Sequence, residues 1–194
     1  ASIELAREKG AFPAFDASAY MASPFIERLP EEIREDIARY GIRNSHLLAI
    51  APAGTISLLA GNLSSGLEPV FESRYRRRVQ IDGEWQEFDV EDYGCRRWRE
   101  LGLQGEPPSR IAAQALAPDL HLKMQASLQP FVDSAISKTV NIPESMPYAD
   151  YSSLYMRAWR LGLKGCTTFR PNPVTGSVLD TIDSGCCQID REGG

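Results

Sequence analysis

Residues 46–60 of this chain read His46-Leu47-Leu48-Ala49-Ile50-Ala51-Pro52-Ala53-Gly54-Thr55-Ile56-Ser57-Leu58-Leu59-Ala60. The first six form an apolar run, which is typical of a strand that is buried on both faces. Pro52 ends that run, and residues 54–60 then predict the first turns of a helix, which Gly61 and Asn62 end. A buried strand that leads directly into a helix is typical of α/β folds with parallel strands.

The rest of the chain continues this alternation. Buried strands are predicted at residues 135–142 and 163–169, and helices at residues 30–40, 91–101, 118–127 and 148–161. Asp82-Gly83 predicts a tight turn between two further strands, residues 75–80 and 85–90, and hence a β-hairpin. Residues 11–30 contain three prolines and are expected to form an irregular connection. Three buried strands in this length indicate part of a barrel or open sheet, not a complete one.

Composition and charge narrow the classes of protein. The chain has 194 residues, 43% hydrophobic and 24% charged, which is enough for one domain with a sizeable core. The net charge of -5 argues against nucleic acid as a partner. The four arginines within residues 74–78 are interpreted as a solvated strand face or a subunit contact. No apolar run approaches the roughly 20 residues of a transmembrane helix. No signal peptide is visible, so we expect a cytoplasmic protein without a membrane partner.

Cysteine and histidine give little sign of a metal centre. No two cysteines have the CxxC spacing of a zinc site or a thioredoxin motif. Cys95 and Cys166 are expected to be buried thiols. His46 and His121 stand apart from one another, so no metal site is predicted.

The turn from strand to helix at residues 51–57 is the strongest candidate for a binding site. The first N–H groups of a helix lack partners, and the helix dipole is positive there. Gly54 lets an anion approach the backbone, and Thr55 and Ser57 add hydroxyl donors, so the turn has the groups to hold a phosphate. The alternative is ordinary helix capping, in which Thr and Ser are common. The GxxxxGK[ST] pattern of a P-loop is absent.

Several segments, in the same order, resemble the catalytic (large) subunits of ribonucleotide reductases. Residues 51–57, followed by Ser64-Ser65-Gly66-Leu67-Glu68-Pro69, are similar to a paired signature of that family. Residues 131–141 look like a later barrel strand with its lead-in. Residues 159–172 look like the helix and strand near the end of the barrel. The resemblance spans residues 42–176.

The resemblance implies a fold and a domain organisation. The fold would be α/β, namely the C-terminal part of the ten-stranded α/β barrel of these reductases, with an added β-hairpin. Residues 1–176 would form this part of the barrel, without its N-terminal half, and residues 177–194 a flexible C-terminal tail. Residues 3–9 are already polar and helix-like, which favours a cut through a longer chain.

The resemblance also implies a role for the turn. In the family, this motif begins a helix whose amides and hydroxyls hold the phosphates of the substrate ribonucleotide. The residues that take over this role are Pro52, Ala53, Gly54, Thr55, Ile56 and Ser57. Ala53 stands where Thr or Ser is common, which removes one hydroxyl. Glu68 is expected to fix the loop beside the site, and Asp133 and Lys138 are expected to pair with each other.

Thr167-Thr168 indicates the class of reductase. In the class that imports a radical from a separate subunit, a Tyr-Tyr pair at or next to this place relays the radical. Threonine hydroxyls cannot be oxidised at accessible potentials, so the resemblance implies a class that makes its radical inside the subunit. Residues 166–172, Cys-Thr-Thr-Phe-Arg-Pro-Asn, resemble the adenosylcobalamin-dependent class. Adenosylcobalamin is the implied cofactor, with no contact residue assignable in this chain.

The radical cysteine of the family and its Asn and Glu neighbours cannot be placed in this chain. No catalytic residue is therefore assigned, and the chain is expected to be inactive alone. Cys186 and Cys187 resemble the tail cysteines that re-reduce the active-site disulfide with the help of a thioredoxin-like reductant. Neighbouring cysteines close only a strained ring, so the alternative is a solvent-exposed or metal-scavenging pair.

Three functional hypotheses follow. The chain is part of a reductase that makes deoxyribonucleotides for DNA synthesis from ribonucleoside diphosphates or triphosphates by thiyl-radical chemistry. Alternatively, it is a stand-alone nucleotide- or phosphate-binding module, or one half of a split reductase. The implied partners are the substrate, the remainder of the reductase chain, the reductant and a second copy in a homodimer. A large exposed apolar edge would favour the fragment or the split subunit over the module.

Overall fold

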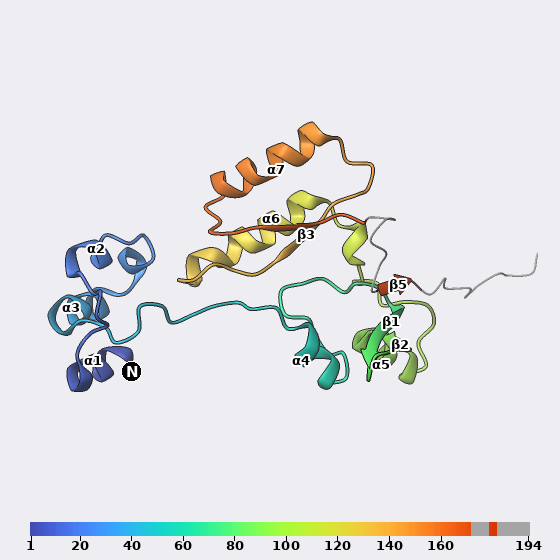
Figure 1. Ribbon diagram of the computed structural model, residues 1–194, viewed down its shortest axis with the longest axis horizontal. Helices are drawn as coiled ribbons and strands as arrows, with labels where there is room; N and C mark the ends of the chain where they lie inside the picture. The colour runs from blue at the N-terminus through green and yellow to red at the C-terminus, as the bar shows by residue number, and fades with distance from the viewer. Residues whose placement is uncertain (172–178, 182–194) are drawn as a thin grey trace, which may run out of the picture.

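The computed structural model describes residues 1–171 and 179–181 (Figure 1). A helical cluster lies at one end of an elongated molecule, and a long extended segment joins it to α4 (Gly54–Leu59). A β-hairpin lies beyond α4, and an α/β unit lies above the extended segment in this view, between the helical cluster and the hairpin. Within these residues, every helix is too short or too polar to cross a membrane.

The N-terminal cluster packs on its own small core. Its elements are α1 (Ser2–Lys9), α2 (Ala17–Met21), the 3₁₀ helix η1 (Ile26–Arg28) and α3 (Glu31–Tyr40). The buried residues at its centre are Ile26, Ile37 and Ile42. The prediction of an irregular connection over residues 11–30 is wrong in part, because α2 lies within it. The Asp16 carboxylate caps this helix by accepting an amide hydrogen bond. Gly41, with φ of 74°, ends α3 as predicted.

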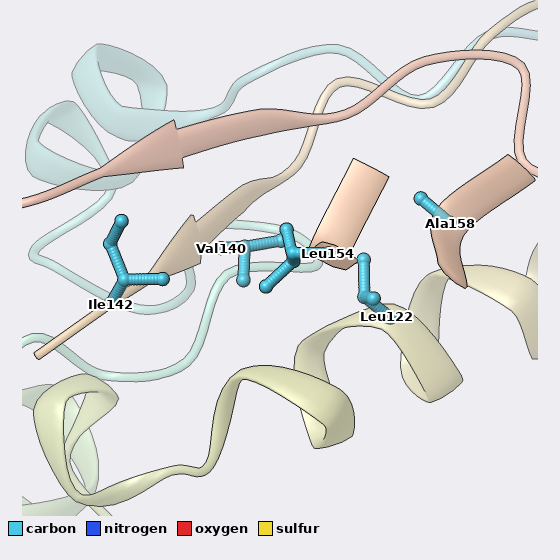
Figure 2. Packing of buried hydrophobic residues seen from close by; sticks show 5 residues of the cluster. All are labelled: Leu122, Val140, Ile142, Leu154 and Ala158. Atoms are coloured by element: carbon cyan, nitrogen blue, oxygen red, sulfur yellow. The ribbon is translucent and has the colours of Figure 1, made fainter. Parts of the chain in front are cut away.

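The α/β unit holds the parallel strands. Its elements are α6 (Pro118–Leu128), the 3₁₀ helix η3 (Gln129–Phe131), β3 (Thr139–Asn141), α7 (Tyr148–Arg160) and β4 (Thr167–Phe169). β3 and β4 are parallel, with Thr139 opposite Thr167. Figure 2 shows the core between β3, α6 and α7, which consists of Leu122, Val140, Ile142, Leu154 and Ala158. The predicted order of strand, helix and strand is confirmed, although both strands are shorter than predicted.

The strand predicted at residues 46–51 forms only in part. Ile50 makes a parallel bridge with Ile136, just before β3, and the other five residues belong to no strand. Leu47 and Leu48 are 52% and 53% exposed, so the prediction that both faces are buried is wrong. The reason is that, within the described residues, the segment has a neighbour on one side only, and its far edge and apolar side chains meet solvent.

Asp133 holds the start of this extended segment. Its Oδ2 accepts the amide of Leu47 at 2.5 Å, and its Oδ1 accepts the amide of Leu48 at 2.8 Å. The predicted pair of Asp133 with Lys138 is therefore wrong, because Lys138 pairs with Glu68 instead. The carboxylate satisfies two amides of the extended segment that have no other described acceptor.

A β-hairpin follows α4, as predicted. β1 (Arg74–Ile81) and β2 (Glu84–Glu91) are antiparallel over their whole length. Asp82 and Gly83 join them with φ values of 53° and 87°, the left-handed pair of a two-residue hairpin turn. The hairpin leads into α5 (Tyr93–Glu100), which the Asp92 side chain caps, and then to the 3₁₀ helix η2 (Ala113–Ala115).

Three residues of the predicted tail are described. They form β5 (Leu179–Thr181), which pairs antiparallel with β1 and extends the hairpin to three strands. Cys186 and Cys187, the predicted redox pair, lie outside the described residues.

Candidate functional site

A cavity of about 690 Å³ lies where α4 begins. Its walls come from α4 and the loop after it, from β1 of the hairpin, and from β3 and β4 of the α/β unit. Four of the six predicted phosphate-binding residues line it, namely Pro52, Ala53, Gly54 and Ser57. Thr55 and Ile56 are not in the wall, and Ile56 is 70% exposed. The volume is in the range of roughly 300–1,000 Å³ that is common for small-ligand sites.

The start of α4 has unpaired backbone donors beside this cavity. No side chain caps the helix, and the first amide with a described acceptor is that of Ser57, which donates to the Ala53 carbonyl at 2.8 Å. The amides of residues 54–56 therefore have no acceptor among the described residues, as expected for the first turn of a helix. A Cβ added to Gly54 would meet nothing within 4 Å, so the space in front of this backbone is open.

Ser57 gives an independent sign of a ligand. Its side chain is buried, with 3% of the residue exposed, and its Oγ has no hydrogen-bond partner in the described part of the chain. Buried hydroxyls in folded proteins almost always have a partner, so an unpaired one in a cavity wall indicates a missing acceptor. The start of α4 supplies amide donors next to this hydroxyl, and the set as a whole is suited to an anion.

A second loop supports the turn. Gly66 has φ of 72°, and a Cβ there would lie 3.5 Å from the Cβ of Ala53, so the two loops pack closely. Glu68 anchors this loop to β3, because its Oε2 accepts from the Lys138 ammonium at 2.9 Å and its Oε1 from the Thr139 amide at 2.5 Å. The Lys138 side chain is only 1% exposed. These contacts agree with the structural role predicted for Glu68.

His121 lies close to this ion pair, and sequence reasoning missed it. It is 1% exposed, on α6, and neither ring nitrogen makes a hydrogen bond of good geometry to a described residue. Burial lowers the pKa of His121, and the nearby Lys138 charge lowers it further. The Ala113 carbonyl and Glu68 oppose this shift to a smaller extent. The lowered pKa of His121 favours the neutral form of the ring.

Neither described cysteine has the properties of a nucleophile. Cys95 is buried on α5, and Cys166 packs against the α/β core, as predicted. Burial raises the pKa of both thiols. Since the thiolate is the nucleophilic form, these shifts reduce the nucleophilic reactivity of both thiols.

Thr167 and Thr168 line the cavity from β4. The Thr168 hydroxyl lies 3.0 Å from the phenol oxygen of Tyr155 on α7.

Comparison with known proteins identifies the family. Residues 1–169 match the family described as "Ribonucleotide reductase, barrel domain". The chain belongs to this family. The resemblance found in the sequence is thereby confirmed, and the α/β unit and the cavity are parts of a reductase barrel domain.

Relatives of this reductase domain are vitamin B12-dependent enzymes by name. A vitamin B12-dependent ribonucleoside-diphosphate reductase of Mycobacterium tuberculosis is 34% identical over 202 residues, covering 93% of this chain and 26% of that protein. One of Thermoplasma acidophilum is 32% identical over 200 residues, covering 92% of this chain and 24% of that protein. The reductase domain described here therefore spans about a quarter of the length of these relatives.

The fold agrees with a solved reductase. The crystal structure of a B12-dependent (class II) ribonucleotide reductase matches 89% of this chain and 26% of its own, with a TM-score of 0.54. The sequence identity is 18%, so this similarity bears on the fold of the reductase domain alone.

Proposed function

We propose that this chain supplies the substrate-phosphate loop and part of the barrel wall of a ribonucleotide reductase. The observation that carries the proposal is the buried, unpaired hydroxyl of Ser57 beside the free amides of the α4 start. A phosphate placed there would accept from several backbone amides and from Ser57 without any lysine. The ribose would then extend toward β3 and β4, which line the same cavity.

The reaction itself needs residues beyond this chain. No described residue is a candidate for the radical thiol, since neither Cys95 nor Cys166 lines the cavity. What the chain contributes is binding: donors hold the phosphate, and the Glu68–Lys138 anchor keeps the loop in place. Such positioning is a large part of catalysis, because a fixed substrate meets the reacting groups in one geometry.

Adenosylcobalamin is proposed as the cofactor of the whole enzyme. Two observations support it, the Thr167-Thr168 pair on β4 and the names of the relatives. We assign no contact residue for it in this chain, because the donors at the cavity are of the kind that suits a phosphate.

The exposed apolar side chains favour a reductase part over a stand-alone module. Leu47, Leu48 and Leu59 are 52%, 53% and 90% exposed on and beside the cavity-bearing segment. Exposed apolar groups along one edge are typical of surfaces that a further polypeptide covers. We propose that the remainder of a barrel covers them, whether as the same chain or as a separate subunit. The proposal has three further parts. A thioredoxin-like reductant acts on Cys186 and Cys187, the whole enzyme is a homodimer, and the hairpin is an addition to the barrel.

The test is calorimetric titration of the reductase that contains this chain with a ribonucleoside diphosphate, and with inorganic phosphate for comparison. Ser57→Ala is expected to weaken binding of the diphosphate about tenfold or more, because a hydrogen bond to a charged group contributes about 1.5–3 kcal/mol. Ser152→Ala, which changes an exposed serine of α7, is the matched control and should leave binding unchanged. Equal binding by both variants would contradict the phosphate site.

A further inference from the structure

The hairpin separates its arginines onto two faces. In the antiparallel register Arg76 lies opposite Asp89 and Arg78 opposite Glu87, so one face carries matched charges. The ion pairs are formed: Arg76 Nε lies 3.4 Å from Asp89 Oδ1, and Arg78 Nε lies 3.1 Å from Glu87 Oε1. This is the solvated strand face that the sequence predicted for the arginine cluster.

Arg77 lies on the other face. Its partners in the register are apolar, because Arg77 is opposite Phe88 and its neighbour on this face, Tyr75, is opposite Val90. Tyr75 is buried and Arg77 is half-buried. Arg77 makes no ion pair with any residue in the described part of the chain, whereas Arg76 does. A half-buried guanidinium without an anion is costly to keep, so its presence on an apolar face needs an explanation.

The same cavity contains Arg77 and the start of α4. Both Arg77 and Tyr75 are in its wall, together with Gly54 and Ser57. The hairpin therefore presents a cation to the cavity whose wall also contains Gly54 and Ser57 of the α4 start.

The cavity also holds two carboxylates, and both are already satisfied. Glu68 accepts from Lys138 and from the Thr139 amide. Asp92 accepts from the Cys95 amide as the cap of α5. Neither carboxylate has a described contact with Arg77, so the charge of the Arg77 guanidinium is available to a ligand.

We propose that Arg77 binds the phosphate groups of the substrate across the cavity from the α4 start. This inference rests on the proposed function, and it adds a residue from outside the phosphate loop. The loop contributes neutral donors only, and a guanidinium contributes the full positive charge that discriminates a nucleotide from its nucleoside. The ligand class is a ribonucleoside diphosphate or triphosphate. The hairpin is thereby a binding element of the site.

The test compares Arg77→Gln with Arg76→Gln in the full reductase. The two variants remove the same charge from adjacent positions of β1, one facing the cavity and one facing the ion-paired surface. Calorimetric titration with a ribonucleoside diphosphate should show about tenfold to hundredfold weaker binding for Arg77→Gln and a change of about twofold or less for Arg76→Gln. Titration with the corresponding nucleoside should give the same affinity for wild type and both variants.

Arg77→Lys is a second variant that distinguishes the loss of the charge from a loss of folding. It keeps the charge, so diphosphate affinity should recover in part and should fall with added salt as steeply as in wild type, while Arg77→Gln should show a shallower dependence. Urea midpoints of all three variants report their folding.

Three results would overturn the assignment. If Arg77→Gln and Arg76→Gln bind diphosphate equally while Ser57→Ala is weakened, the phosphate loop stands and Arg77 is no part of the site. If Arg77→Gln weakens nucleoside and diphosphate by the same factor, Arg77 shapes the cavity and does not bind phosphate. Unchanged binding in both Arg77→Gln and Ser57→Ala would refute the proposed function as well.

Discussion

Glu68→Gln should destabilise the fold by about 2–3 kcal/mol. The Lys138 side chain is 1% exposed and its partner carboxylate 26% exposed, so glutamine leaves an ammonium buried without a counter-charge. Breaking a fully buried pair in this way costs about 3–5 kcal/mol. Solvent reaches the carboxylate side here and reduces that cost. The other acceptor of the ammonium in the described residues, the Thr139 carbonyl at 3.4 Å, is too distant to replace it.

Urea unfolding followed by far-ultraviolet circular dichroism measures this free energy. Glu87→Gln is the matched control, since Glu87 pairs with arginines on the exposed hairpin face and its side chain is 46% exposed. Exposed pairs contribute about 0–1 kcal/mol, so this variant should lie close to wild type. The double variant Glu68→Leu with Lys138→Met should recover much of the loss, because well-packed apolar residues often replace a buried pair at little cost.

The reasoning is refuted if Glu68→Gln is no less stable than Glu87→Gln. It is also refuted if the double variant is as unstable as the sum of its single variants, because then the two side chains would not be coupled. In either case the loop would be held by something other than this ion pair.

Three further outcomes are expected. Gly54→Ala should leave the free energy of unfolding equal or raise it by up to about 1 kcal/mol, because alanine favours the start of a helix. The same variant should weaken ribonucleotide binding in a titration, because its methyl group enters the open space in front of the backbone. Burial lowers the pKa of His121 from 6.5 in the folded protein. The contribution of the neutral ring to folding stability is therefore complete above about pH 6.5 and is lost as the pH falls toward the folded-state pKa. His121→Leu should accordingly flatten the fall in urea midpoint between about pH 7.5 and 5.5. Asp133→Ala should accelerate hydrogen exchange at the amides of residues 47 and 48, which lose their acceptor.

Much of the local structure could be predicted, because its causes are local. Asp82-Gly83 supplies the left-handed conformations that a two-residue hairpin needs, and Gly41 and Gly162 end their helices with φ of 74° and 76°. Short helices inside residues 11–30 were missed, since prolines dominate that composition and the Asp16 cap gives a weak signal. The start of α4 was found because a strand, a proline and a glycine follow one another within a few residues.

Residues 46–51 are a segment whose burial is predicted wrongly from the sequence. Their apolar pattern predicts burial on both faces, while Leu47 and Leu48 are more than half exposed. A pattern of this kind reflects the surroundings in which the sequence folds, and we propose that those include a second neighbouring strand and a cover from outside the described residues. The mismatch is itself informative, because it locates the edge at which we propose that the rest of a barrel joins.

The groups that surround the cavity could not be found from the sequence for a different reason. Glu68 and Lys138 are 70 residues apart, and their pairing depends on how two loops pack, which no spacing rule reports. Arg77 belongs to a run of like charges, and the composition of that run gives no reason to separate it from the neighbouring arginines. Strand alternation separates it: every second residue of β1 points to the same side, so one arginine of the run must face away from its neighbours. The register of the hairpin shows that this arginine faces the cavity, and its lack of a counter-charge there makes it the residue to test.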